Sequence, residues 1–144
     1  MPSVYFHRLT VSSKDIDEQG HVNNLEYLRW MQDAAVAHSA AQGWNAQRYR
    51  AQGSGWVVRS HHIEYLQPAF AGDQIMVVTW VAGFRKVRSL RKYQIHRSHD
   101  QALLASAETD WAYIGLERRV PRRIPQELID SFDVVTDPII EFPP

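Results

Sequence analysis

One helical stretch followed by four strand-like stretches is the pattern that most limits how this chain can fold. Apolar residues recur at helical spacing from Leu25 to Gln42, and Gly43 is a natural stop for that helix. Ahead of it, Val4–Val11 mixes β-branched and aromatic residues and is predicted to be a strand. Beyond the loop at Gly53–Gly55, turn signals separate four further predicted strands: Trp56–Tyr65, Gln74–Gly83, Val87–Arg97 and Ala102–Ile114.

This order predicts an α+β protein in which a curved antiparallel sheet of about five strands wraps around one long central helix. The four successive strands are expected to form a meander. Both faces of Gln74–Gly83 are rather apolar, so we expect one face to pack on the helix and the other against a second subunit of a dimer or tetramer. We expect a single domain over residues 1–144, with 117–144 as a C-terminal extension and at most a short helix at Gln126–Phe132.

Composition excludes several classes of protein. The chain has 144 residues, 44% of them hydrophobic, which suits one ordinary core. Lys+Arg and Asp+Glu both total 16, so no bulk positive field would attract nucleic acid or an anionic membrane. The absence of Cys fits a reducing compartment, and the longest mostly apolar run, Ile75–Phe84, is far below membrane-spanning length. With no signal-peptide pattern at the start, we predict a soluble, cytoplasmic protein.

The ten residues Asp15–Asn24 carry an unusual density of polar side chains just before the helix. A solvated loop with a helix cap is the simple interpretation, with Asn23 as N-cap and Glu26 as its capping-box partner. A helix start also offers unpaired N–H groups and a positive dipole end, so the N–H of Asn24 or Leu25 could stabilise an oxyanion. An acid slightly upstream could then act as nucleophile or general base, which predicts acyl transfer.

The stretch DIDEQGHVNNLEYLRW, Asp15 to Trp30, closely resembles the signature of hotdog-fold acyl-CoA thioesterases of the hydroxybenzoyl-CoA thioesterase type, and it also resembles the D-x-x-x-H-V-N-N element of plant acyl-ACP thioesterases. Ile63 to Ile75 is similar to the family's second block, and Arg118 to Pro125 to its frequent ending. The resemblance, from about Tyr5 to Leu128, implies a hotdog fold and hydrolysis of an acyl-CoA to free acid and coenzyme A. It implies no metal and no cofactor, since coenzyme A is part of the substrate.

The same resemblance implies roles for single residues. Asp17 matches the acid assigned as nucleophile or general base, and Asn24 falls at the helix-start position whose backbone N–H polarises the thioester carbonyl. His21 matches the His of the acyl-ACP branch, and Gln19 replaces an Asn of that branch, so its role is open. Glu64 resembles a position that in some hotdog enzymes faces the neighbouring subunit's site as a base or water-orienting group. Its alternative is an ordinary strand acid paired with an Arg.

Substrate-binding candidates lie around a predicted hairpin turn and on the helix. A flexible basic rim would suit the three phosphate groups of a coenzyme A tail, although solvated basic turns are common. Tyr27 is expected in the core or in the wall of an acyl pocket. The basic candidates are Arg85, Lys86, Arg88 and Arg91.

Several alternatives stay open at this point. Asp15 is expected to be a structural acid that contacts backbone amides, or else to be the essential carboxylate itself. His61 and His62 point to opposite faces of a strand, and the loose pair His96 and His99 lacks carboxylate neighbours, so we assign no metal. The rival functions are a hotdog hydratase or dehydratase and a non-catalytic acyl-CoA-binding protein.

Overall fold

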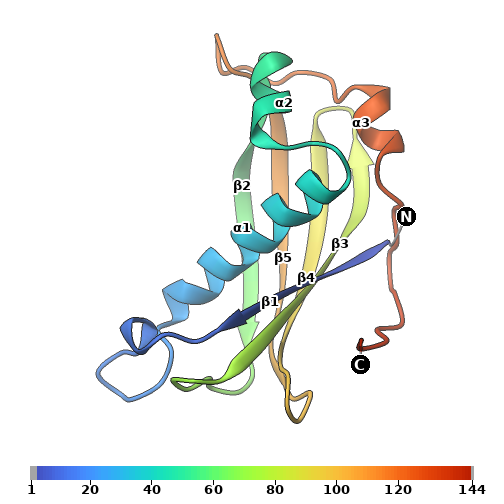
Figure 1. Ribbon diagram of the computed structural model, residues 1–144. Helices are drawn as coiled ribbons and strands as arrows, with labels where there is room; N and C mark the ends of the chain where they lie inside the picture. The colour runs from blue at the N-terminus through green and yellow to red at the C-terminus, as the bar shows by residue number, and fades with distance from the viewer. Residues whose placement is uncertain (1–2, 144) are drawn as a thin grey trace.

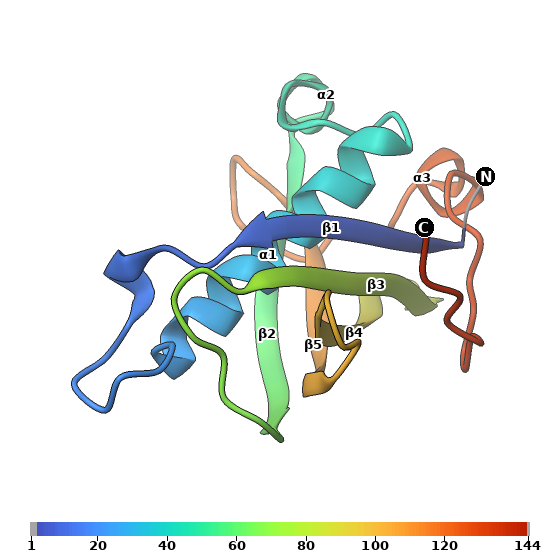
Figure 2. The same cartoon turned by 60° about the horizontal axis from the view of Figure 1, so that its bottom comes forward.

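Packing of one helix on one sheet organises the chain in the computed structural model, which describes residues 3–143. Helix α1 lies across one face of a five-stranded antiparallel sheet, and the sheet curves so that β1 and β3 turn steeply away from β2 and β5 (Figures 1 and 2). The elements are β1 (Val4–Thr10), α1 (Asn24–Ala41), α2 (Ala46–Ala51), β2 (Ser54–Tyr65), β3 (Gln74–Arg85), β4 (Arg88–Arg97), β5 (Leu103–Gly115) and α3 (Gln126–Asp130), with a short 3-10 turn at Ser13–Asp15.

The α+β class and the five-stranded antiparallel sheet are confirmed. All predicted strands are present, with ends displaced by one or two residues. Helix α1 has 18 residues, so only a covering helix is established and not the long central helix of the expectation. Helix α2 was not predicted, although Asn45 caps it in the usual way, by accepting a hydrogen bond from the N–H of Arg48 at 2.8 Å.

The strand order β1-β3-β4-β5-β2 corrects the expected four-strand meander. Only β3, β4 and β5 follow one another in space, while β2 pairs with β5 and β1 pairs with β3. The link 66–73 therefore crosses from one edge of the sheet to β3, about three strand spacings or 14 Å away. Eight extended residues reach about 26 Å, so the crossing is easy. Alternation identifies strands, but it does not say which edge each strand occupies.

The main core lies between α1 and the inner face of the sheet. Helix α1 buries Tyr27, Trp30, Met31, Ala34 and Ala35 there. The small side chains of Ala34 and Ala35 lie in the middle of this face and take up little space between the helix axis and the sheet. The strand residues that complete this core include Ile75, Val77, Tyr93, Ile95, Leu104 and Ala105.

The outer face of β3 is covered by the chain's own C-terminal residues, which corrects the expectation of a second subunit there. Met76, Val78 and Trp80 are buried on this face against β1 and a tail segment. The tail runs along the outside of the sheet in Figure 1 and is tied to β3 by a hydrogen bond from Val135 N–H to Val81 O, 3.0 Å. None of the helices in residues 3–143 is long and apolar enough to cross a membrane.

The close approach of α1 to the sheet can be tested at Ala34, whose side chain is fully buried. Ala34→Leu should lower the free energy of unfolding by about 1–3 kcal/mol, because added methylenes overpack a filled interface. Ala40→Leu is the matched control: Ala40 is exposed on the same helix, so its effect should stay within about 0.5 kcal/mol. Urea unfolding measures both, and equal effects at the two positions would contradict the close packing.

Candidate functional site

The polar stretch before α1 folds as a tight hairpin. Ile16 and Val22 form an antiparallel bridge, and the N–H of Asp17 donates to His21 O at 2.8 Å. The N–H of Gly20 donates a hydrogen bond to Asp17 O at 3.1 Å. Asp at the first and Gly at the fourth position are favoured in such turns. Gly20 has φ +87°, a backbone angle that residues other than glycine rarely adopt. The local sequence therefore builds a rigid turn that begins at Asp17.

The Asp17 carboxylate is oriented by this turn. Its Oδ1 accepts a hydrogen bond from the Gln19 N–H at 2.9 Å, and its Oδ2 lies 3.7 Å from His21 Nδ1. The Asp17 side chain is 28% exposed, so one oxygen is engaged locally while the carboxylate stays reachable. The structure brings Asp17, His21 and Gln19 together in this hairpin, where Gln19 contacts Asp17 through its backbone N–H and its side chain is exposed.

The start of α1 presents one unpaired N–H beside the hairpin. Asn23 is the N-cap, as predicted, and its Oδ1 accepts from the Leu25 N–H at 3.0 Å. The N–H of Asn24 has no acceptor within residues 3–143. Of the two N–H groups considered from the sequence, only that of Asn24 is therefore free, because the cap occupies the other.

Backbone bonds fasten the hairpin to the helix start. The N–H of Asn23 donates to Asp15 O at 2.8 Å, so Glu26 does not form the predicted capping box and lies 3.5 Å from Arg29. The capping box belongs to the preceding turn, where the Asp15 carboxylate accepts from the Ser12 N–H at 3.1 Å. The expected contact of the Asp15 carboxylate with a backbone amide is present, whereas its role stays a prediction.

The end of β2 also reaches the start of α1. Tyr65 donates its hydroxyl to Asn24 O at 3.2 Å and packs edge-on against Tyr27, whose ring is buried in the main core. Glu64, the preceding residue, points to the other face of β2, is 65% exposed and lies 3.4 Å from His62 Nε2. Within residues 3–143 its partner is thus a histidine and not an arginine.

The predicted basic cluster divides into two groups. Arg85 and Lys86 lie at the β3–β4 hairpin, at the opposite end of the sheet from the polar hairpin (Figure 1). Arg88 is bound to Asp110 by two hydrogen bonds of 3.2 and 2.6 Å, which hold the pKa of that carboxyl below its usual range. Arg91 does not belong to an exposed rim. It is 6% exposed, because strand alternation turns it toward α1.

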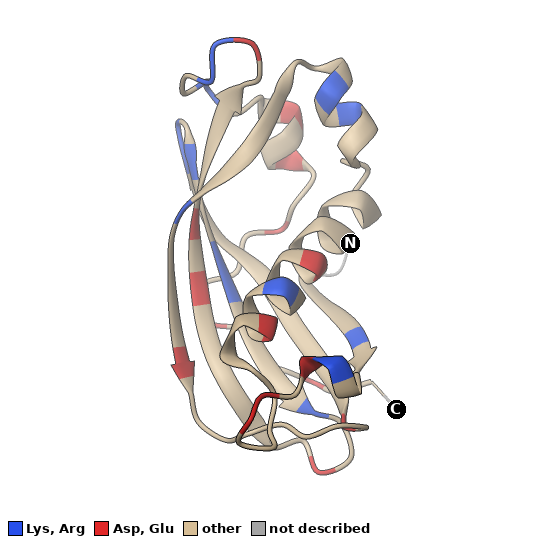
Figure 3. Cartoon of the chain, turned by 90° about the vertical axis from the view of Figure 1, so that its left-hand side faces the viewer, with Lys and Arg blue, Asp and Glu red and all other residues tan. Residues whose placement is uncertain are grey.

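Both signs of charge are spread along the chain, and red and blue positions alternate along α1 in Figure 3. No group of three or more His, Cys, Asp or Glu side chains within residues 3–143 is arranged to hold a metal ion.

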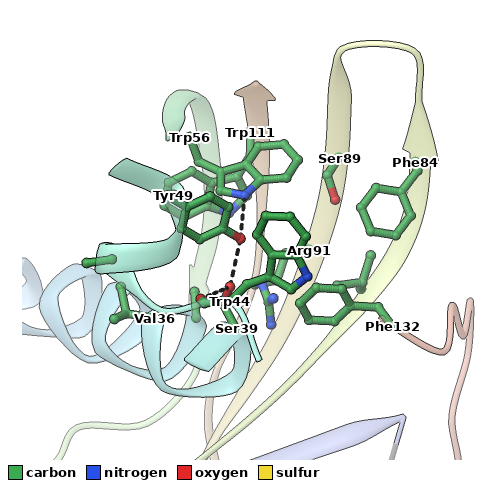
Figure 4. Close-up of a pocket in the computed structure, with 13 residues that line it drawn as sticks. Val36, Ser39, Trp44, Tyr49, Trp56, Phe84, Ser89, Arg91, Trp111 and Phe132 are labelled. Atoms are coloured by element: carbon green, nitrogen blue, oxygen red, sulfur yellow. Dashed lines mark hydrogen bonds between the residues drawn. The ribbon is translucent and has the colours of Figure 1, made fainter. Parts of the chain in front are cut away.

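An aromatic pocket of about 220 Å³, which was not predicted, lies between the C-terminal half of α1, α2 and the sheet (Figure 4). A chain of hydrogen bonds forms part of its wall: Trp56 Nε1 donates to Tyr49 Oη at 3.0 Å, and Tyr49 Oη lies 2.8 Å from Ser39 Oγ. The lining residues are Ala35, Val36, Ser39, Trp44, Ala46, Tyr49, Trp56, Val81, Phe84, Ser89, Arg91, Trp111 and Phe132. Their spacing in the sequence gives no sign that they converge.

A buried polar pair forms part of this region. Arg91 Nη1 donates to His38 Nδ1 at 2.9 Å and to Thr79 Oγ1 at 3.1 Å. Burial, and secondarily the charge of Arg91, lowers the pKa of His38 to about 3. His38 is therefore a neutral acceptor at neutral pH, with its Nε2 carrying the hydrogen.

The depressed pKa of His38 should make the fold less stable in acid. In the unfolded chain His38 binds a proton below about pH 6.5, whereas in the folded chain it does not until about pH 3. Neutral His38 therefore makes its full contribution to the free energy of unfolding above about pH 6.5. Between about pH 6.5 and pH 3 this contribution falls by about 1.4 kcal/mol for each pH unit. Urea unfolding at pH 7 and at pH 5 measures the fall in the free energy of unfolding between these two pH values. This fall should be about 2 kcal/mol smaller in His38→Gln than in wild type, because Gln accepts the Arg91 hydrogen bond without titrating. The same loss in both proteins would contradict this assignment.

Comparison with known proteins gives a consistent picture. A model of the thioesterase-like superfamily matches residues 11–132. A 1,4-dihydroxy-2-naphthoyl-CoA thioesterase from Synechocystis has a similar structure, with 22% identity, a TM-score of 0.82 and coverage of 89% of this chain and 94% of its own. A Staphylococcus aureus protein solved in complex with CoA has 18% identity and a TM-score of 0.84, over 97% of this chain and 96% of its own.

An acyl-ACP thioesterase from Bacteroides thetaiotaomicron is similar as well, with 18% identity and a TM-score of 0.84. The match covers 99% of this chain but 58% of that protein. At these identities the solved structures establish the shared fold.

Proposed function

The chain belongs to the thioesterase-like superfamily, and on this premise we propose that it hydrolyses an acyl-CoA thioester to a free acid and coenzyme A. The family predicted from Asp15–Trp30 is confirmed, and with it the class of thioester hydrolase. Coenzyme A as the carrier is supported by the similar Staphylococcus aureus protein that binds CoA. A cytoplasmic location and the absence of a cofactor stay predictions.

One observation carries the proposal: a carboxylate oriented by a hairpin that is itself bonded to a helix start with a free N–H. In the proposed mechanism Asp17 attacks the thioester carbonyl or activates a water molecule, and the Asn24 N–H holds the oxyanion. His21 Nδ1 lies 3.7 Å from the second oxygen of Asp17, beyond hydrogen-bond distance, and its proposed role is to position that oxygen when substrate binds. A thioester carbonyl has little resonance stabilisation, so a positioned carboxylate and one good oxyanion donor are sufficient chemistry. The exposed Gln19 side chain is a candidate for holding water.

We place the complete site in a homo-oligomer. Strand β2 is an unpaired edge of 12 residues, and Leu25 and Val36 on α1 are 69% and 62% exposed. A second copy paired antiparallel along β2 would cover Leu25 and bring opposite ends of the two sheets together. Arg85 and Lys86 of one copy would then be near the polar hairpin of the other, where they suit the phosphates of coenzyme A. Glu64 lies at the same end of β2 as its own chain's hairpin, so this pairing would leave it beside its own site and not the neighbour's.

Asp17→Asn should lower kcat by about 100- to 10,000-fold, because it removes the nucleophile or general base. Asp15→Asn is the matched control: it weakens a backbone cap in the same segment and should keep most of the activity. Thiol release from a panel of short, medium, long and aromatic acyl-CoAs measures both variants. A dead Asp15→Asn with an active Asp17→Asn would overturn the assignment, although thioester hydrolysis would stand.

The same panel separates the rival functions. A hydratase would change the absorbance of an enoyl-CoA without releasing thiol, and a binding protein would retain acyl-CoA without turnover. Either result would replace the proposed hydrolysis.

The oxyanion donor can be removed without disturbing the helix. Asn24 is the first helical residue, where proline is tolerated, and Asn23 before it has φ −61° and ψ 132°, as a residue preceding proline requires. Asn24→Pro deletes the N–H of interest together with the Asn24 carboxamide and should lower kcat by about 100- to 1,000-fold. Asn24→Ala keeps the N–H and should stay close to wild type. Circular dichroism checks that α1 persists, and an active, folded Asn24→Pro would exclude this N–H as the donor.

A further inference from the structure

The aromatic pocket lies away from the polar hairpin in the same chain. The first helical residue that lines it, Ala35, is eleven residues beyond Asn24 on α1, which is about 16 Å along a helix axis. Within one chain the pocket is therefore separate from the acid and the oxyanion donor, and in the homo-oligomer proposed above it would lie at the end of the sheet that the neighbouring copy's hairpin approaches.

The pocket wall contains a buried cation without an acidic partner. Arg91 makes both of its hydrogen bonds within residues 3–143 through Nη1, to the neutral His38 and to Thr79. The ion pairs of the described residues all involve other side chains, and burial lowers the pKa of Arg91. Nε and Nη2 are left as donors without an acceptor there, although an arginine stays charged in proteins. The Phe132 ring, which also lines the pocket, lies 6.0 Å from Arg91 Cζ.

Such a cation is costly unless something pairs with it. Charges in protein interiors are normally paired, and a well-packed apolar residue would stabilise the fold at least as well as an unpaired guanidinium. Arginine presents parallel N–H donors that match the two oxygens of a carboxylate. The surroundings of Arg91 therefore favour an anionic group as the missing partner.

The other lining residues of the pocket indicate which kind of molecule carries that anionic group. Flat apolar walls surround the volume of about 220 Å³, and they are supplied by Trp44, Trp56, Trp111 and Phe132. A cavity of about 150 Å³ already accepts benzene, so this one has room for a ring or a short chain together with a carboxylate. Val36 at its edge is 62% exposed, which leaves a way in from solvent in the single chain.

We propose that this pocket binds an apolar carboxylic acid, with its hydrocarbon part between the tryptophans and its carboxylate on Arg91. Figure 4 shows the aromatic side chains and Arg91 converging on the same space. The carboxylate has two possible sources: a free acid, such as the product of thioester hydrolysis, or the distal carboxylate of an acyl group. Binding of the free acid does not depend on the proposed hydrolysis.

Calorimetry and tryptophan fluorescence with the full chain test the proposal directly. Octanoate and phenylacetate should bind about ten- to a hundredfold more tightly than octanamide and phenylacetamide, which have the same shape without the charge. Arg91→Met should abolish this preference. Arg50→Gln removes one positive charge from the exposed face of α2 and should leave the preference unchanged.

A second variant keeps the proposal testable if Arg91→Met fails to fold. Val36→Trp narrows the edge of the pocket from an exposed helix position and keeps Arg91, so it should weaken binding of acids and amides alike. Comparing hydrolysis of adipoyl-CoA and hexanoyl-CoA then separates the two sources. Binding of free acids alone identifies a free acid as the occupant, whereas an Arg91-dependent preference for adipoyl-CoA identifies a distal carboxylate.

Equal binding of acids and amides by the wild-type protein, together with no preference for adipoyl-CoA, would overturn the proposal. That failure is distinguishable from failure of the proposed function, since thiol release from a neutral acyl-CoA is measured independently of ligand binding in this pocket.

Discussion

Burial of one face of α1 against the inner face of the sheet is the interaction on which the other features depend. The small residues in the middle of the helix set how closely the two layers approach, and this distance fixes both ends of α1 relative to the strands. At the first end, the helix start meets the hairpin and Tyr65 of β2. At the other end, the large aromatic side chains of the sheet and of α2 surround the aromatic pocket and do not fill it.

Polar groups in this protein follow the same constraint. Within the hairpin at 16–22 the N–H groups of Asp17, Gln19 and Gly20 find acceptors, and the Val22 N–H donates to Ala69 O. The Asn23 side chain accepts from the Leu25 N–H, which leaves the Asn24 N–H for a ligand. In the interior, Arg91, His38 and Thr79 satisfy one another only in part. Unsatisfied donors therefore occur at both ends of the helix, and each lies where a substrate or ligand could supply the acceptor.

Much of the local structure was predictable because it depends on neighbouring residues. Periodicity located α1 and the strands to within one or two residues, Asn23 was identified as the cap, and the motif around Asp17 identified the family. The errors share one cause. The meander, the second subunit over β3 and the exposed rim at Arg91 all required knowledge of which distant segment lies alongside. The roles assigned to single site residues stay predictions.

The sequence by itself determined the elements, the turn at Gly20 and the presence of an acid just before a helix start, because caps, turns and alternation are properties of a few consecutive residues. Only the tertiary structure decided that β2 is an edge strand of the sheet, that the C-terminal tail covers β3, and that Arg91 faces an aromatic pocket. These outcomes depend on contacts between residues far apart in the chain, and the free energy of such contacts is set by how the layers pack and not by any local pattern.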